Sequence, residues 1–495
     1  MEHKLSILVL SFLLVVVSAC TVDNNDEVSF NGNESFFAFR NYSTDGSEMW
    51  VSDGTAERTH ILKDVNLLNL SILPSYHNYS VFNQKLYFVA DDGLNGYELW
   101  VTNGSEYGTR LLKDINNNST ALDHSNSMPL NFTIFKNKLF FTAYTGIYDW
   151  EVWFTDGTEE GTKMLKDINP FNNDQPGRPK FFKVFNDRLY FIADDGVHGQ
   201  EIWVTDGTEE GTVLLKDINV SDNGSFSFGI PDFTVFNNRL YFAADDGING
   251  VELWVTDGTE NGTSMLKDIN PGIYSEIPQS GSPRMFQVFN DQLFFVAYSF
   301  NHGFELWKTD GTEAGTTIFK EIYTDPMYLG GVLAYGQTFA VLNNKMYFQA
   351  TDGIHGYELW ATDGTADGTM MVKNINATDE ENSWSNGTDS SIGELTVFNN
   401  KIYFSADDGV HGVELWFSDG TENGTMMLKD IRRGNEFTDS YPKSFLVFNE
   451  QLFFITGISD KLWVSDGTEV GTQEMFNSAQ PSGINADFLM DGVLY

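Results

Sequence analysis

The chain has 495 residues, 15% of them aromatic, and it carries 70 acidic against 29 basic residues for a net charge of −41. Such a high aromatic content indicates a chain that buries a core, not a disordered polyelectrolyte. The negative surface would repel phosphate backbones and anionic lipid headgroups, which argues against nucleic acid as a partner. The same surface would attract cations and basic partners.

The first expected element is a secretory leader. Lys4 precedes an apolar run from Leu5 to Ala19, which is too short to span a bilayer comfortably but suits the h-region of a signal peptide. The run ends at Cys20, the only cysteine, in the sequence Val-Ser-Ala-Cys. This ending resembles a prokaryotic lipoprotein signal. The alternative is an ordinary secretory signal that happens to end beside a cysteine.

The resemblance implies a signal peptide over residues 1–19 and a lipidated Cys20, followed by a polar tether to residue 27. Residues 28–495 would then be an exported body that is anchored to a membrane by its N-terminal lipid. We therefore expect a lipoprotein at the cell surface.

One phrase then recurs nine times along the chain: Glu, an aliphatic residue, Trp, two residues and Asp-Gly-Thr, with a period of about 50 residues. A fixed period of this length predicts one supersecondary unit that is copied many times. The tryptophans are Trp50, Trp100, Trp153, Trp203, Trp254, Trp307, Trp360, Trp416 and Trp463. The aspartates of the best-preserved turns are Asp156, Asp206, Asp257, Asp310, Asp363, Asp419 and Asp466.

A single copy predicts four short strands. In one copy the β-prone runs are residues 181–185, 189–193, 201–205 and 212–218, and Gly, Asn and Asp turns separate them. No stretch of the repeat has helical periodicity. Four-stranded antiparallel sheets at this period predict a single all-β array over residues 28–495, a β-propeller. We label the strands of each blade a to d from the inside outward, and we expect the Trp of strand c to lie between neighbouring blades.

Nine hairpins of this kind predict about nine blades, above the usual four to eight. The C-terminal residues 488–495 match the start of a further a–b pair. Either this strand helps to close the ring, or the ring is larger or incomplete. Two smaller rings and an open arc are the remaining alternatives.

The best copies read ELWVTDGT at residues 252–259 and ELWATDGT at residues 358–365. The chain is similar here to the ELWxxDGT repeat family, which is found in exported and surface proteins of prokaryotes, and the similarity covers roughly residues 28–477. The resemblance implies export. It implies no particular activity, because the family is defined by its repeat.

The propeller has two rims. The Asp-Gly-Thr segments are c–d turns at one rim, and we interpret them as fold-stabilising, because Asp accepts backbone N–H bonds and Gly permits a positive φ. The other rim, formed by the b–c and d–a loops, carries a repeated acidic motif. Its members are Asp91, Asp92 and Glu98; Asp194, Asp195 and Glu201; Asp245, Asp246 and Glu252; and Asp407, Asp408 and Glu414.

Three carboxylates on a glycine-containing loop could coordinate Ca²⁺, which takes six to eight oxygen ligands. The alternative is that Asp caps the loop while Glu anchors it by hydrogen bonds or pairs with a repeated lysine such as Lys216. The loop histidines, such as His198, we interpret as loop fillers, because Asn95 and Asn249 take the same place.

Copies three and six replace the acidic motif with Ala143-Tyr144-Thr145 and Ala297-Tyr298-Ser299. The d–a loops vary and hold aromatic residues such as Tyr274 and Trp384, and variable loops on a rigid scaffold usually carry recognition. We therefore expect a binding or adhesion scaffold with a protein or carbohydrate ligand at this rim. The alternatives are an exported carbohydrate-active hydrolase with paired carboxylates and a purely structural envelope protein. No catalytic residue is assigned, because the candidate acids are repeated and an active site needs an asymmetric set.

Overall fold

The computed structural model describes residues 36–43, 46–66, 79–117, 126–146, 149–170, 177–221, 224–226, 232–323, 339–377, 390, 392–432, 439–457, 461–475 and 485–494. The leader, Cys20, the tether and Trp384 lie outside the described residues. The described part of the chain contains no helix that is long and apolar enough to cross a membrane.

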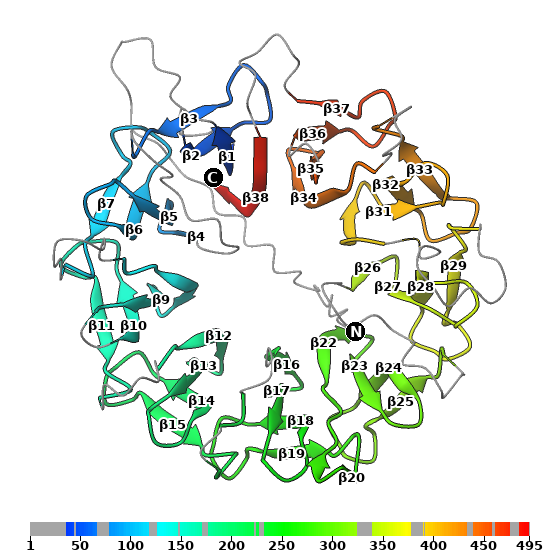
Figure 1. Cartoon of the computed structure of the whole chain (residues 1–495), viewed down its shortest axis with the longest axis horizontal. Coiled ribbons are helices and arrows are strands. Elements are labelled where there is room, and N and C mark those ends of the chain that lie inside the picture. Colours follow the sequence, from blue (N-terminus) through cyan, green and yellow to red (C-terminus); the bar gives the residue numbers. More distant parts are fainter. Residues whose placement is uncertain are drawn as a thin grey trace, which may run out of the picture.

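In the described part of the chain, nine four-stranded antiparallel sheets form a ring, and Figure 1 shows them following one another in chain order around it. Blade 1 contains β1 (Phe36–Ser43), β2 (Gly46–Ser52), β3 (His60–Lys63) and the C-terminal β38 (Asn485–Leu494). Blade 2 contains β4 (Tyr79–Phe82), β5 (Lys85–Asp91), β6 (Tyr97–Thr102) and β7 (Arg110–Lys113). Blade 3 contains β8 (Leu130–Phe135), β9 (Lys138–Tyr144), β10 (Trp150–Thr155) and β11 (Lys163–Lys166).

The next three blades follow the same order of strands. Blade 4 contains β12 (Lys180–Phe185), β13 (Arg188–Asp194), β14 (Gln200–Thr205) and β15 (Val213–Lys216). Blade 5 contains β16 (Thr234–Phe236), β17 (Arg239–Asp245), β18 (Val251–Thr256) and β19 (Ser264–Lys267). A two-stranded ribbon, β20 (Ile273–Tyr274) and β21 (Ile277–Pro278), separates it from blade 6, which contains β22 (Arg284–Phe289), β23 (Gln292–Ser299), β24 (Gly303–Thr309) and β25 (Thr317–Lys320).

The last three blades complete the ring. Blade 7 contains β26 (Ala340–Leu342), β27 (Lys345–Ala350), β28 (Glu358–Thr362) and β29 (Met370–Lys373). Blade 8 contains β30 (Thr396–Phe398), β31 (Lys401–Asp407), β32 (Val413–Ser418) and β33 (Thr425–Lys429). Blade 9 contains β34 (Pro442–Phe448), β35 (Gln451–Thr456), β36 (Leu462–Ser465) and β37 (Gln473–Glu474). The prediction of four-stranded antiparallel blades in a β-propeller is confirmed.

The a–b hairpins owe their tightness to asparagine. In blade 5, Phe236 pairs with Arg239, so that Asn237 and Asn238 alone form the turn. Their φ angles are 46° and 56°. Two positive φ angles define the type I′ turn that matches the twist of the strands, and Asn tolerates this conformation better than most residues. The turn residues thus set the register of each hairpin.

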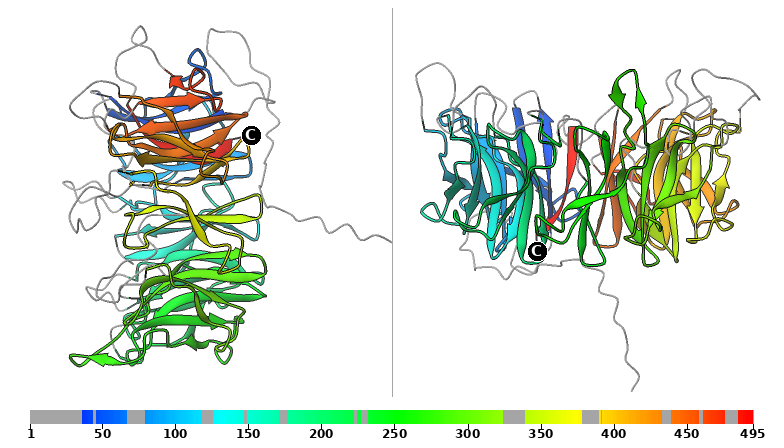
Figure 2. Two further views of the ribbon diagram at one scale, coloured as in Figure 1. Left: turned by 90° about the vertical axis from the view of Figure 1, so that its right-hand side faces the viewer. Right: turned by 90° about the horizontal axis from the view of Figure 1, so that it is seen from below.

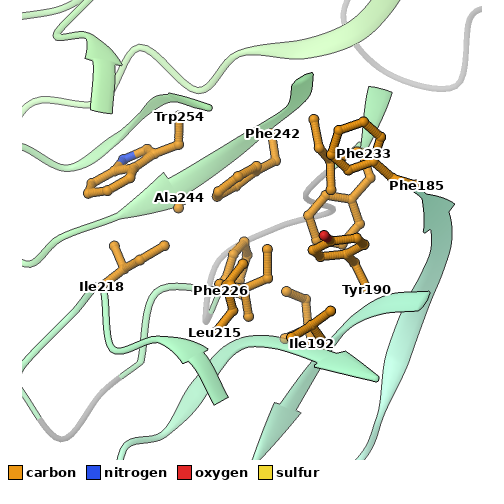
Figure 3. Close-up of a cluster of buried hydrophobic side chains, with 13 residues drawn as sticks. Phe185, Tyr190, Ile192, Leu215, Ile218, Phe226, Phe233, Phe242, Ala244 and Trp254 are labelled. Atoms are coloured by element: carbon orange, nitrogen blue, oxygen red, sulfur yellow. The ribbon is translucent and has the colours of Figure 1, made fainter. Parts of the chain in front are cut away.

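The repeated tryptophans pack between blades, as the sequence predicts. In the cluster of Figure 3, Trp254 of blade 5 lies with Phe242 of its own strand pair against Ile218 of blade 4. Phe242 and Trp254 are directly opposite each other on β17 and β18. Each sheet is therefore buried on both faces, which explains why its strands have apolar runs in place of a strict alternation.

The first and last blades close the ring. The strand order of the first sheet is β3-β2-β1-β38, so the C-terminal strand supplies the innermost strand of the N-terminal blade. Trp50 of blade 1 packs against the buried core of blade 9, which includes Leu446 and Phe453. The segment that matches a further a–b pair therefore joins blade 1, and the ring has nine blades.

Candidate binding rim

The Asp-Gly-Thr turns are held by their own side chains. In blade 5, the Asp257 carboxylate accepts hydrogen bonds from the backbone N–H of Thr259 at 2.9 Å and from its hydroxyl at 2.7 Å. Thr259 Oγ1 in turn accepts the N–H of Gly262 at 3.0 Å. A Cβ on Gly262 would lie 2.0 Å from the Asp257 carboxylate, so a larger residue would displace that carboxylate from its bonds to Thr259. The same Asp–Thr bonds recur in the other turns, which agrees with a structural role.

The repeated lysine does not pair with the glutamate of strand c. Its ammonium instead donates to a backbone carbonyl near the c–d turn of the next blade: Lys63 to Thr109 at 2.8 Å, Lys166 to Thr212 at 2.8 Å and Lys373 to Thr425 at 2.9 Å. Lys113, Lys216 and Lys429 make longer bonds of the same kind. The expected alternative of a Lys–Glu pair is therefore wrong, because the lysine points to the neighbouring blade.

The glutamate of strand c is a buried anchor for the d–a loop. Glu98 has no exposed surface. Its carboxylate accepts hydrogen bonds from the backbone N–H groups of Ile115 at 2.8 Å and Ser127 at 2.9 Å, and from the Ser127 hydroxyl. Ile115 and Ser127 both follow the d strand β7 and belong to the d–a segment, so the carboxylate joins the start of strand c to this segment of the rim.

The other blades repeat this anchor. Glu151, Glu201, Glu252, Glu305, Glu358 and Glu414 are all completely buried, and each accepts the N–H of the Ile that lies two residues beyond its d strand. Burial raises the pKa of Glu98 and Glu252 to about 8, and the hydrogen bonds they accept oppose this shift. Blade 9 has Lys461 in this place, and its ammonium pairs with Glu474 at 2.7 Å.

The two aspartates of each acidic loop cap the loop itself. In blade 2, Asp91 accepts the N–H of Gly93 at 2.7 Å, and Asp92 accepts the N–H groups of Leu94 and Asn95, both at 2.9 Å. The pairs Asp194–Asp195, Asp245–Asp246 and Asp407–Asp408 make the same bonds.

The histidines of these loops bond to the aspartate that precedes the first glycine of their own loop. His198 Nδ1 lies 2.8 Å from Asp195 Oδ2, and the Asn95 amide makes the equivalent 2.8 Å bond to Asp92. Within the described residues no three acidic, histidine or cysteine side chains gather as they would to hold a metal ion. The alternative of aspartates that cap the loop and a glutamate that anchors the d–a segment therefore accounts for the hydrogen bonds of the motif.

One part of the rim departs from the repeat and forms a cavity of about 450 Å³. It lies between the d–a segment that follows blade 5, which includes Asn270, Tyr274 and Gln279, and the b–c loop of blade 6, which includes Ser299 and Phe300. The ribbon of β20 and β21 stands beside it and projects beyond one face of the ring (Figure 2). Blade 6 is one of the two blades in which aromatic residues replace the acidic motif.

Polar and aromatic groups converge on this cavity. The Tyr274 and Phe300 side chains are 69% and 66% exposed. Ser299 is only 9% exposed, and its hydroxyl has no hydrogen-bond partner in the described structure. Asn270 fixes the loop, since its Oδ1 accepts the N–H of Phe300 at 3.0 Å. The sequence pointed to Tyr274 and Ser299, but it gave no sign that Phe300 and Gln279 would meet them.

Comparison with known proteins gives no family. No family model matches the chain, and no curated protein matches it. Among solved structures it is similar to puromycin hydrolase, with 12% identity, a TM-score of 0.37, and coverage of 77% of this chain and 59% of that one. It is also similar to BamB from Moraxella catarrhalis, with 10% identity, a TM-score of 0.38 and coverage of 81% and 96%.

AztD from Citrobacter koseri has 11% identity, a TM-score of 0.39 and coverage of 93% and 97%. At these values the matches carry no argument about function, and the chain spans about six-tenths of the puromycin hydrolase. Its own strand order identifies the chain as a β-propeller of nine blades.

Proposed function

We propose that this protein is an exported, lipid-anchored binding protein that holds an uncharged carbohydrate in the cavity between blades 5 and 6. The apolar leader and Cys20 support export and anchoring. The meeting of exposed aromatic rings with an unpaired buried hydroxyl in this cavity is the observation that carries the binding proposal. A surface propeller with such a site would serve in adhesion or in the capture of glycans.

The chemistry of the cavity suits a sugar. Its volume of about 450 Å³ falls within the range of small-molecule sites. The apolar face of a sugar ring can stack on Tyr274 or Phe300, while its hydroxyls can bond to the Gln279 and Asn301 amides that also line the cavity. An unpaired buried hydroxyl costs about 1–3 kcal/mol. A sugar hydroxyl that pairs with Ser299 Oγ would recover part of that cost.

The charges around the cavity favour a neutral ligand. No lysine or arginine lines it, and its one histidine, His302, lies 3.0 Å from the Glu321 carboxylate. The chain as a whole has a net charge of −41. An anionic sugar would therefore be repelled at long range without gaining a cationic partner at short range.

The test is calorimetric titration of the full-length protein with a panel of neutral oligosaccharides. We expect Tyr274→Ala and Phe300→Ala each to weaken binding by about threefold to tenfold, the usual scale for one aromatic contact. Tyr107→Ala is the matched control, because Tyr107 is 86% exposed on a c–d turn at the opposite rim. If no neutral glycan binds, or if all three variants bind like wild type, this assignment is wrong.

A further inference from the structure

A second cavity lies at the same rim, between blades 3 and 4. It has a volume of about 270 Å³, and its walls include Asn131 and Trp150 of blade 3 together with Arg178 and Lys180 at the start of blade 4. Blade 3 is the other copy in which aromatic residues replace the acidic motif. Figure 1 shows that these two blades are neighbours in the ring. Both cavities therefore adjoin a blade that has aromatic residues in place of the acidic motif.

The basic residues of this second cavity are unusual in so acidic a chain. Neither Arg178 nor Lys180 forms an ion pair with a carboxylate in the described part of the structure, and no acidic residue lines the cavity. Lys180 is half-buried. Burial, and then the charge of Arg178, lower the pKa of Lys180. Two cations held close together, with no carboxylate at ion-pair distance in the described structure, create a local positive field.

One acidic residue lies near the site without lining it. Burial raises the pKa of Asp149, and Arg178 is close enough to oppose that shift. Asp149 therefore neutralises part of the Arg178 charge, whereas Lys180, which lies over the Phe181 ring, has no carboxylate partner in the described structure.

The equivalent positions of other blades show what is particular to this one. Arg284 begins the inner strand of blade 6, as Lys180 does in blade 4, and both lie over an aromatic ring: Arg284 over Phe304 at 4.4 Å and Lys180 over Phe181 at 5.3 Å from the centroid. Lys443 follows a proline at the same place in blade 9 and is exposed. Of these three basic residues, only Lys180 lines the cavity between blades 3 and 4.

The walls of this cavity are held in place by contacts across the blades. Thr142 Oγ1 of blade 3 donates a hydrogen bond to the carbonyl of Pro179 at 2.7 Å. The Trp150 ring packs against Tyr144 with their centroids 5.9 Å apart. Arg178 has a φ of 34°, in the left-handed region that costs a non-glycine residue roughly 1–2 kcal/mol. The two cations and the aromatic wall are thus presented by a braced segment, which lowers the entropy cost of binding.

We propose that this cavity binds a small organic anion, whose carboxylate pairs with Arg178 and Lys180 and whose apolar face lies on Trp150. Arginine binds carboxylates through its planar fork, and lysine adds a point charge. The small volume and the net charge of −41 argue against a polyanion. The aromatic wall favours an organic anion over a bare inorganic one. This site is separate from the neutral-sugar cavity of blades 5 and 6.

The experiment uses calorimetric titration of the full-length protein with two carboxylates, glucuronate and benzoate, and with glucose and inorganic phosphate for comparison. We expect both carboxylates to bind, more weakly at high salt, with no binding of glucose at this site. Lys180→Met and Arg178→Gln should each weaken carboxylate binding by roughly tenfold or more, as expected for one charge-assisted hydrogen bond. Neither variant should lower the melting temperature without ligand by more than about 1–2 °C, because Lys180 has only a contact with the Phe181 ring to lose and Arg178 only its attraction to Asp149.

Two controls separate this site from the rest of the rim. Lys443→Met removes the equivalent basic residue of blade 9, and Tyr274→Ala damages the neutral-sugar cavity; both should bind carboxylates like wild type. The proposal is overturned if neither carboxylate binds wild-type protein at about 10 mM, a concentration that would reveal millimolar affinity. It is also overturned if Lys180→Met binds as well as wild type, or if phosphate binds as tightly as benzoate.

Discussion

Replacing Trp254 tests whether the repeated tryptophans hold neighbouring blades together. Trp254 is 6% exposed and lies in the cluster that joins blades 4 and 5 (Figure 3). A buried indole removes about 150–250 Å² from water, which at about 25 cal/mol per Å² corresponds to roughly 4–6 kcal/mol. Part of this area stays buried with alanine, and a cavity is added. We therefore expect Trp254→Ala to destabilise the fold by about 3–5 kcal/mol.

The indole nitrogen allows a graded test. Trp254 Nε1 is buried and has no hydrogen-bond partner in the described structure. Trp254→Phe therefore loses area but no hydrogen bond, and we expect it to cost about 1–2 kcal/mol. Tyr107→Ala, at an exposed turn, should stay within about 0.5 kcal/mol of wild type.

Stability would be measured by urea denaturation and by thermal melting. At about 2 °C per kcal/mol for a large domain, Trp254→Ala should lower the melting temperature by about 6–10 °C. An unchanged melting temperature would refute the packing argument and would make Trp254 a candidate for ligand stacking.

Four further predictions concern the buried glutamates, calcium, ring closure and the lipid anchor. Burial raises the pKa of Glu48, Glu98, Glu151, Glu252 and Glu305 to about 8, so the folded chain retains protons that the unfolded chain releases near pH 4.5. The stabilising contribution of these glutamates is complete below pH 4.5 and is lost as the pH rises to 8. The melting temperature should therefore be lower at pH 8.5 than at pH 5.5. An equal or higher value at pH 8.5 would show that hydrogen bonds keep these groups ionised. Because the aspartates of the acidic loops bond within their own loops, calcium and magnesium at equal ionic strength should shift the melting temperature alike. A rise with calcium alone that disappears in the double variant Asp245→Asn, Asp246→Asn would contradict this. Deleting residues 485–495 removes the partner of β1, so limited proteolysis should cleave blade 1 faster than in the full chain, and an unchanged cleavage pattern would argue against closure by β38. Mass spectrometry of the mature N-terminus should find an acylated Cys20, and an unmodified Cys20 or cleavage elsewhere would exclude the lipid anchor.

The sequence alone determined the blade. The Asn pairs, the Asp-Gly-Thr turns and the spaced apolar runs act over a few residues, so each copy specifies its own hairpins wherever it lies. The period of about 50 residues then implied an array of like units, and a repeated Trp implied a repeated interface. These features could be predicted because they depend on interactions between residues that are close in sequence, and every copy of the repeat contains those residues.

The tertiary structure decided how distant segments meet. The sequence grouped Glu98 with Asp91 and Asp92, but folding buries Glu98 beneath the loop, where it binds Ser127 of a segment 29 residues away. It also left open which blade the C-terminal strand joins, because a single edge strand can pair with any exposed edge. Blade 1 receives β38 because closure of the ring brings β38 beside β1, the first strand of the described structure.

The two cavities depended on folding even more. Ser299 with Gln279, and Trp150 with Lys180, come from strand ends and loops of successive blades that have no shared motif. Their meeting follows from the packing of one blade on the next, which no local pattern encodes. The repeat thus specifies a scaffold from short-range chemistry, whereas its candidate sites arise where non-repeated loops are brought together across a blade interface.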